Sequence, residues 1–407
     1  MSDALMQGFP VPADSRVTIA NWQDPPFNRW GFSHVRELIP TQRIAAATHA
    51  PSAPRRDCVA DIDPIRVPRH RGGTSTFRDF LLDSNVDAAV IMHDGNIVFE
   101  RYFNGVAADT PHLLMSVSKS LVGCVAGILS SRGELDVAAP IERYVPESAD
   151  SGYSGATVRD LLDMRTGVAF NEDYTDPDAD VRVVEEHIGW RPSSHGEPRG
   201  LYEFLRSLSS GGSHGGPFTY RSADTDMLGW VCERAAGVRM ADLISDFLWR
   251  PMGAEFDAMI TCDALGSAIH DGGVCACARD LARFGQLLLD GGAAAGRAVI
   301  PEPWLADALG APPEVRAAFA ASPASALLPG GWYRNQFWFL PQPQNQPVQL
   351  CRGIYGQFVM VDRATRTVGV LFSTWPDAED SARTIDTVNA FHAVGQHLAG
   401  VAPTRFL

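Results

Sequence analysis

The sequence predicts an α+β fold in which strands from both ends of the chain form one mainly antiparallel sheet. Strand-like apolar runs bounded by turn residues occur early, over 87–103, and again late, over 348–373. Between them, from about 136 to 259, the pattern is mostly that of helices and loops. We therefore expect a sheet flanked by helices, with a mostly helical lobe inserted between the two halves of the sheet.

These patterns also suggest domain boundaries. Residues 1–73 are rich in Pro, Arg and Ala and weakly periodic, so we expect an extended N-terminal arm that lies on the body of the protein. An α/β lobe is expected over 74–140 and 260–407, and a helical lobe over 141–259. We find no internal repeat.

Individual elements follow from local signals. His93-Asp-Gly-Asn96 separates two apolar runs and favours a β-hairpin. Apolar residues at helical spacing from Leu121 to Leu129 predict a helix that ends at Gly133, which places Ser116 at or near its N-terminus. Further helices are expected over 157–162, 222–236, 280–289 and 378–398, and further strands over 348–354, 357–361 and 367–373.

Composition excludes several classes of function. The chain has 407 residues, 45% of them hydrophobic, and a formal net charge of −14 without a basic stripe, so nucleic acid is not an expected partner. The longest uncharged apolar run, 121–129, is too short to cross a bilayer, and the first twenty residues do not resemble a secretory signal. Seven cysteines without a CxxC pair suggest reduced thiols in the cytoplasm, and we expect neither a metal nor a cofactor.

One residue type is almost missing. Of the 34 Lys and Arg residues, only Lys119 is a lysine, which leaves 33 arginines. Ser116 precedes it by three positions, so both side chains lie on the same helix face. A neutral amine can take the proton of a serine hydroxyl, provided that burial lowers its pKa, whereas arginine does not deprotonate in proteins. The pair predicts a nucleophilic serine and its base; a surface lysine retained by chance is the alternative.

The helix N-terminus supports the same chemistry. Its free backbone N–H groups, including that of Ser116, can stabilise an oxyanion. A second N–H donor and a group that protonates the leaving atom are still needed.

Ser116-Val-Ser-Lys119 resembles the SxxK motif of the serine β-lactamases and penicillin-binding proteins. Several blocks resemble more specifically the 6-aminohexanoate-dimer (nylon-oligomer) hydrolases and related carboxylesterases of this superfamily, over nearly the whole chain. These blocks are Asn21–Trp30, His112–Ser120, Asn171–Tyr174, Gly189-Trp190 and Gly272–Val274. The resemblance implies the β-lactamase/transpeptidase-like fold, no cofactor and a homodimer.

The same resemblance implies the rest of the machinery. Tyr220-Arg-Ser222 matches the family's YxN or YxS motif, whose tyrosine works with the lysine and protonates the leaving group; a phenol with its pKa lowered by an adjacent ammonium would suit this role. The strand that normally carries KTG reads Cys351-Arg-Gly-Ile354, and the N–H of Ile354 becomes the second oxyanion donor. The missing KTG lysine argues against a β-lactamase or cell-wall peptidase as the main activity.

Pocket residues are implied by the nylon-hydrolase blocks: Tyr174, Glu185, Trp190, Asp271 and Tyr355. Glu185 and Asp271 are carboxylates, so we hypothesise that they bind a free ammonium group of the substrate; exposed acidic side chains are the alternative.

The sequence thus predicts a serine hydrolase that cleaves linear amides of the 6-aminohexanoate-oligomer type, and short esters, through an acyl-enzyme on Ser116. Three alternatives stay open: a carboxylesterase without a natural amide role, a β-lactamase or D-amino-acid peptidase-like hydrolase, and a non-catalytic binding protein with the same fold.

Overall fold

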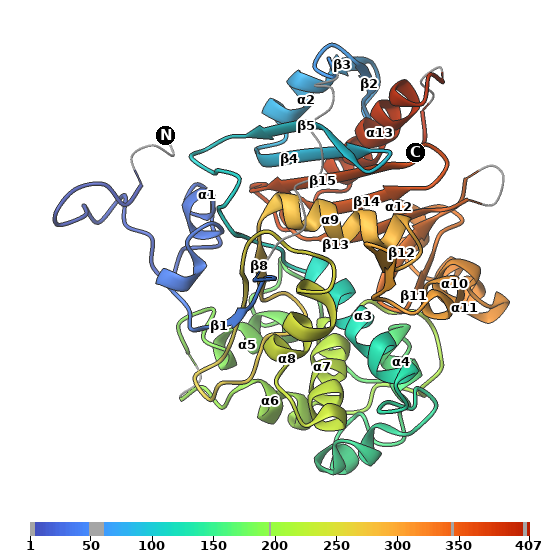
Figure 1. Ribbon diagram of the computed structural model, residues 1–407. Coiled ribbons are helices and arrows are strands. Elements are labelled where there is room, and N and C mark those ends of the chain that lie inside the picture. Colours follow the sequence, from blue (N-terminus) through green and yellow to red (C-terminus); the bar gives the residue numbers. More distant parts are fainter. Residues whose placement is uncertain (1–4, 49–60, 195–196, 343–345, 402–404) are drawn as a thin grey trace.

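The computed structural model describes residues 5–48, 61–194, 197–342, 346–401 and 405–407. Its centre is a seven-stranded antiparallel sheet in the order β11-β12-β13-β14-β15-β4-β5 (Figure 1). These strands are β4 (Val86–His93), β5 (Asn96–Tyr102), β11 (Trp332–Arg334), β12 (Phe337–Leu340), β13 (Val348–Gly353), β14 (Gln357–Asp362) and β15 (Thr367–Ser373). Because β15 pairs with β4, the late strands join the early hairpin, and the predicted sheet from both ends of the chain is confirmed.

The hairpin between β4 and β5 has the predicted turn. Asp94 and Gly95 both have positive φ, 47° and 79°, and His93 pairs with Asn96 across the turn. This geometry is that of a two-residue turn with Asp-Gly at its centre. It fixes the register in which the buried β4 enters the sheet.

Helices cover both faces of the sheet (Figure 1). Alternate residues of β4 belong to two hydrophobic clusters, with Val90 in one and Ile91 in the other. The first cluster includes α9 (Ala278–Leu289) and the second includes α2 (Phe77–Asp83) and α13 (Ser381–Leu398). The sheet is therefore buried on both sides, which explains why its strands read as continuous apolar runs.

Helix α3 (Val117–Ser131) lies between the sheet and the helical lobe. Every residue from Val117 to Leu129 is buried, because α3 packs against β13 on one side and α7 (Ser222–Ala236) on another. The rest of this lobe comprises 3-10 turns Ile141–Arg143 and Pro146–Asp150, helices α4 (Val158–Leu162), α5 (Asp180–His187), α6 (Leu201–Ser207) and α8 (Met240–Ile244), and a π-helical turn Ser245–Trp249.

The segment expected as an arm contributes a strand. β1 (Thr41–Ile44) pairs with β7 (Ala258–Thr261) in a four-stranded sheet, β1-β7-β8-β6, completed by β8 (Val274–Ala276) and β6 (His112–Leu113). The same segment contains α1 (Asn28–Gly31), a 3-10 turn Val35–Glu37 and β2 (Arg66–Pro68), which pairs with β3 (Thr74–Thr76). The remaining elements are β9 (Ala293–Ala294), β10 (Arg297–Ala298), α10 (Glu302–Gly310), α11 (Pro313–Ala320) and α12 (Ala324–Leu327).

The closing helix begins three residues later than expected. Asp380 accepts a hydrogen bond from the N–H of Arg383 and so caps α13, which starts at Ser381 rather than at residue 378. An N-terminal cap of this kind satisfies a backbone donor that the helix leaves free.

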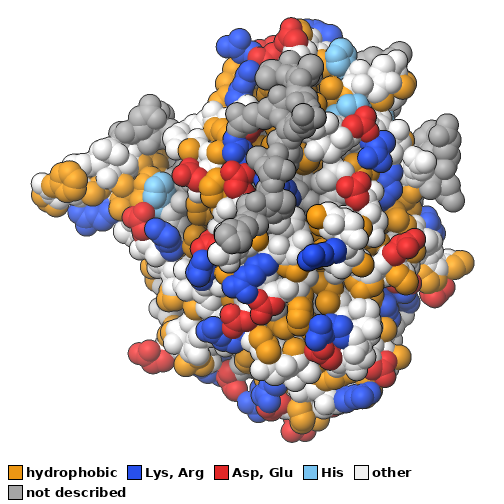
Figure 2. Space-filling model, viewed as in Figure 1, with side chains coloured by type: hydrophobic (Ala, Val, Ile, Leu, Met, Phe, Trp, Pro, Cys, Tyr) orange, Lys and Arg blue, Asp and Glu red, His pale blue; other side chains and the backbone are white. Residues whose placement is uncertain are grey.

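The surface has mixed charge. On the face shown in Figure 2, arginine side chains lie among Asp and Glu side chains and do not form one stripe. No helix within the described ranges is long and apolar enough to cross a membrane.

Candidate active site

The chain enters α3 through a strained residue. Met115 has a positive φ of 47°, which is uncommon for a side chain of this size. Ser116 follows as the N-cap of α3, and only 7% of its surface is exposed. This entry brings the Ser116 hydroxyl to the end of the helix with free N–H groups.

Lys119 lies one turn into α3 and is 1% exposed. Its Nζ is 2.9 Å from Ser116 Oγ, 3.0 Å from Ser222 Oγ and 3.0 Å from the backbone oxygen of Asp271. The same nitrogen also lies 3.3 Å from the carboxylate oxygen Oδ2 of Asp271. The structure thus brings together the predicted serine and lysine, and it fixes the amine between acceptors from three segments.

The protonation of Lys119 differs from the expectation. Burial lowers the pKa of Lys119, as expected, but acidic neighbours outweigh this effect and raise the pKa above its ordinary value. These neighbours are Tyr220, which contributes only as its phenolate, and the carboxylates of Asp271, Glu172 and Asp226. Lys119 is consequently an ammonium in the resting site and must lose a proton before it can act as a base.

Tyr220 precedes α7 and faces the same space. Lys119 Nζ lies 5.3 Å from the centre of its ring, and Trp338 packs against the ring at 5.1 Å. Burial raises the pKa of Tyr220, and the charge of Lys119 opposes this only in part. The expectation of a lowered phenol pKa is therefore corrected: the pKa of Tyr220 lies above its ordinary value.

The end of β13 comes close to the start of α3 at a glycine. A Cβ on Gly353 would lie 2.6 Å from the Leu114 oxygen and 3.0 Å from the Ser116 nitrogen, so only glycine permits this approach. Ile354 follows directly. Among the described residues, no hydrogen bond uses the N–H of Ser116 or of Ile354. Both N–H groups are therefore available to a bound acceptor, and their role as oxyanion donors stays a prediction.

Two cavities meet at Ser116 and Ile354. The first, of about 270 Å³, is lined by the polar side chains of Tyr220, Glu172 and Arg352 together with an apolar wall of Pro323, Ala324, Leu327, Leu328 and Trp338. The second is small, about 30 Å³, and its lining includes Val181, Val184, Ile188, Trp190 and Asp271. Tyr174 borders both. Ser116, Tyr174 and Ile354 therefore border both cavities.

The predicted ammonium site is already neutralised. Glu185 lines the small cavity, but its carboxylate accepts hydrogen bonds from Arg182 at 3.0 Å and Arg191 at 2.5 Å. Asp271 is paired with Lys119. Since both carboxylates have cationic partners, neither is free to bind a substrate ammonium in this structure.

The other predicted pocket residues divide into two groups. Trp190 lines the small cavity, and its backbone oxygen accepts a hydrogen bond of 2.8 Å from the indole of Trp22 in the N-terminal segment. Tyr355 lines neither cavity; it packs edge-on against Phe32 at 5.2 Å. Substrate binding by Tyr355 therefore stays a prediction.

The sequence analysis missed two charged residues in the first cavity. Glu172 accepts a hydrogen bond from Ser222, and the Arg352 side chain, which is 15% exposed, lies 3.6 Å from the exposed Glu379. Both lie inside quoted motifs, but acidic and arginine side chains are usually exposed, so their type alone does not indicate a pocket. Arg352 is one position before Gly353, and this adjacency to the oxyanion strand is the signal that could have identified it.

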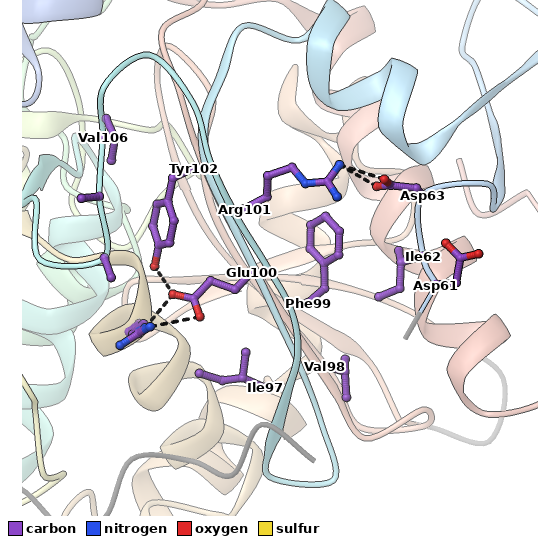
Figure 3. A pocket seen from close by; sticks show the side chains of 13 residues that line it. Asp61, Ile62, Asp63, Ile97, Val98, Phe99, Glu100, Arg101, Tyr102 and Val106 are labelled. Carbon is purple, nitrogen blue, oxygen red and sulfur yellow. Dashed lines mark hydrogen bonds and ion pairs between the residues drawn. The ribbon is translucent and has the colours of Figure 1, made fainter. Parts of the chain in front are cut away.

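A larger cavity, of about 650 Å³, lies elsewhere, beside β5 (Figure 3). Four of its charged groups form two pairs: Arg101 binds Asp63 at 2.8 Å, and Arg279 binds Glu100 at 2.6 Å. It contains neither Ser116 nor Lys119. Within the described part of the chain, no group of three His, Cys, Asp or Glu side chains could hold a metal ion.

Comparisons with known proteins agree with this geometry. The chain matches the Beta-lactamase family over residues 82–393. It is 37% identical over 372 residues to a 6-aminohexanoate-dimer hydrolase of Paenarthrobacter ureafaciens, covering 91% of each chain, and 28% identical over 202 residues to esterase EstB of Burkholderia gladioli, covering 45% of this chain and 50% of that one. Its structure is similar to that of a Bacillus anthracis protein assigned as a 6-aminohexanoate-dimer hydrolase, with a TM-score of 0.85 and 26% identity over 96% of this chain and 99% of that chain.

Proposed function

Since the chain belongs to the Beta-lactamase family and is a serine hydrolase of amides or esters, we propose that Ser116 is its nucleophile and that linear amides of the 6-aminohexanoate-oligomer type, with short esters, are its substrates. The observation that carries the proposal is the 2.9 Å contact between Lys119 Nζ and Ser116 Oγ at the start of α3. A buried amine at this distance can remove the hydroxyl proton as the oxygen attacks.

The acylation step follows from the contacts. Ser116 Oγ attacks the carbonyl carbon while Lys119, once neutral, takes its proton. The N–H groups of Ser116 and Ile354 stabilise the oxyanion. Tyr220 then protonates the leaving nitrogen or oxygen and regains its proton from Lys119. In deacylation, water attacks the acyl carbon, its proton passes to Tyr220 and Lys119, and Ser116 Oγ regains a proton as the acyl group leaves.

The lining of the first cavity suits a linear substrate whose leaving group carries a carboxylate. Its apolar wall, formed by Leu327, Leu328 and Trp338 among others, suits a chain of methylene groups. Arg352 lies in the same cavity, and among the described residues its ion-pair partner is Glu379, at 3.6 Å. A guanidinium at this place suits the carboxylate of a leaving ω-amino acid, so the loss of the KTG lysine need not remove positive charge from the site.

A fluorophosphonate probe tests the nucleophile. We expect stoichiometric covalent labelling of Ser116, and no labelling of a Ser116→Ala variant, because the probe reports an activated serine. Mass spectrometry of the labelled peptide is the measurement. An unlabelled protein would favour the non-catalytic binding protein.

A panel of short-chain esters, aminoacyl amides and a lactam, compared by kcat/KM, separates the remaining candidates. Hydrolysis of linear amides with kcat/KM values comparable to those for esters would support the proposal. Ester turnover alone would identify a carboxylesterase, and preferred lactam turnover a β-lactamase or D-amino-acid peptidase-like enzyme.

A separate prediction concerns the free amine at the acyl end of the substrate. Because Glu185 is held by Arg182 and Arg191, we expect acetylation of a substrate's free amine to change kcat/KM by less than about threefold, the scale of an exposed ion pair. A loss of tenfold or more that disappears in Glu185→Gln would show instead that the substrate ammonium displaces a guanidinium.

Two predictions from the sequence belong to the same proposal. The resemblance predicts a homodimer, and the cysteine pattern predicts the cytoplasm. All six cysteines within the described ranges are buried and free of disulfides, which is compatible with reduced thiols.

A further inference from the structure

Lys119 needs a route for its proton, and the structure contains one. Its Nζ donates to Ser222 Oγ at 3.0 Å, and the hydroxyl of Ser222 donates to Glu172 Oε1 at 2.6 Å. The N–H of Ser222 donates to the second oxygen of Glu172, also at 2.6 Å. These contacts form a continuous chain of hydrogen bonds from the amine, through one hydroxyl, to a carboxylate.

We propose that Glu172 is a positioning residue that stores the proton of Lys119, received through Ser222, while Lys119 acts as base toward Ser116. The inference rests on the proposed function of Ser116 and Lys119. It explains how an ammonium surrounded by acidic groups becomes a neutral amine without a proton being lost to water.

The proton count balances. Ser222 passes its hydroxyl proton to Glu172 and takes one from Lys119, which leaves a neutral carboxyl and a neutral amine. The O–H bond of Ser116 then breaks, its proton moves to Lys119, and Oγ bonds to the substrate carbon. Lys119 supplies the proton that Tyr220 gives to the leaving atom. Glu172 returns its proton by the same path after deacylation.

The surroundings of Glu172 suit this role. Burial raises the pKa of Glu172, and Lys119 and Ser222 only partly oppose this effect, so a neutral carboxyl is accessible. Other titratable or charged groups also face Glu172. They are Tyr174 on its own loop, Tyr220 just before α7, Asp224 within α7, Asp271 before β8 and Arg352 on β13. The hydroxyl of Tyr174 also donates a hydrogen bond to Glu172, at 3.1 Å.

The test is the pH dependence of kcat in Glu172→Gln, which keeps the size and one acceptor oxygen but cannot store a proton. We expect kcat at pH 7 to fall on the order of 100-fold, the scale of one proton-transfer group. We also expect the acidic limb of the profile to move to higher pH, since Lys119 must then deprotonate to solvent. Glu172→Asp, which restores a carboxyl, should return the limb toward the parent's position even where kcat stays reduced.

Two further variants separate the relay from a structural role. Ser222→Ala breaks the chain in its middle, and we expect the same shift, with no further shift in the double variant with Glu172→Gln. Asp224→Asn removes another buried carboxylate, which is bonded to Thr166, and should leave the limb in place. A uniform loss of kcat without a shift in Glu172→Gln would overturn the relay. Failure of the parent to label at Ser116 would instead overturn the proposed function.

Discussion

Replacing Lys119 with arginine should lower kcat by a factor on the order of 10³ or more, almost as far as replacing it with alanine. Arginine keeps the positive charge and can still donate hydrogen bonds, but its guanidinium does not deprotonate and therefore cannot take the Ser116 proton. The site is also closed, because Lys119 is 1% exposed and contacts acceptors from three segments.

Single-turnover acylation by an activated ester measures this step directly. Arg366→Lys is a suitable control, because it exchanges the same two residue types at an exposed position whose guanidinium pairs with Asp94. We expect this control to match the parent. A Lys119→Arg variant within tenfold of the parent would mean that the amine acts only through its charge, and the proposed mechanism would then be wrong.

Gly353→Ala should reduce kcat by about 10²–10³, the loss that follows removal of one oxyanion donor. The added methyl group would lie 2.6 Å from the Leu114 oxygen and 3.0 Å from the Ser116 nitrogen, so β13 must move away from the start of α3. This movement separates the N–H of Ile354 from that of Ser116. Substrate binding in the cavity wall should change less, so KM should change little.

The control for this variant is Gly212→Ala, at a glycine whose added Cβ would contact nothing within 4 Å. Thermal unfolding of both variants shows whether the fold persists. If Gly353→Ala keeps the parent's kcat while remaining folded, the donors at Ser116 and Ile354 do not form the oxyanion hole.

Local patterns predicted the parts of the fold that depend on neighbours in sequence. The Asp94-Gly95 turn requires positive φ at two positions, and the apolar run after Lys119 fits only a buried helix. The pairing of Ser116 with Lys119 is likewise a matter of helical spacing. The resemblance to known families then added Tyr220 and Ile354, which no local pattern connects to Ser116.

The remaining features depend on contacts between distant segments. β1 pairs with a strand more than two hundred residues later, and nothing in its own four residues specifies this partner. The pKa of Lys119 was expected to fall with burial, but it rises because the acidic groups of Tyr220, Asp271, Glu172 and Asp226 come from other parts of the chain. The ion pairs of Glu185 with Arg182 and Arg191 also became evident only from the geometry.

The single lysine has a consequence for handling the protein. A protease that cuts only after lysine has one peptide bond to attack in the entire sequence, between Lys119 and Ser120. In the folded chain both residues are 1% exposed and lie within α3. Cleavage into fragments 1–119 and 120–407 therefore reports the opening of this helix, without background from surface sites. Cleavage at the single lysine thus measures whether the central helix is intact.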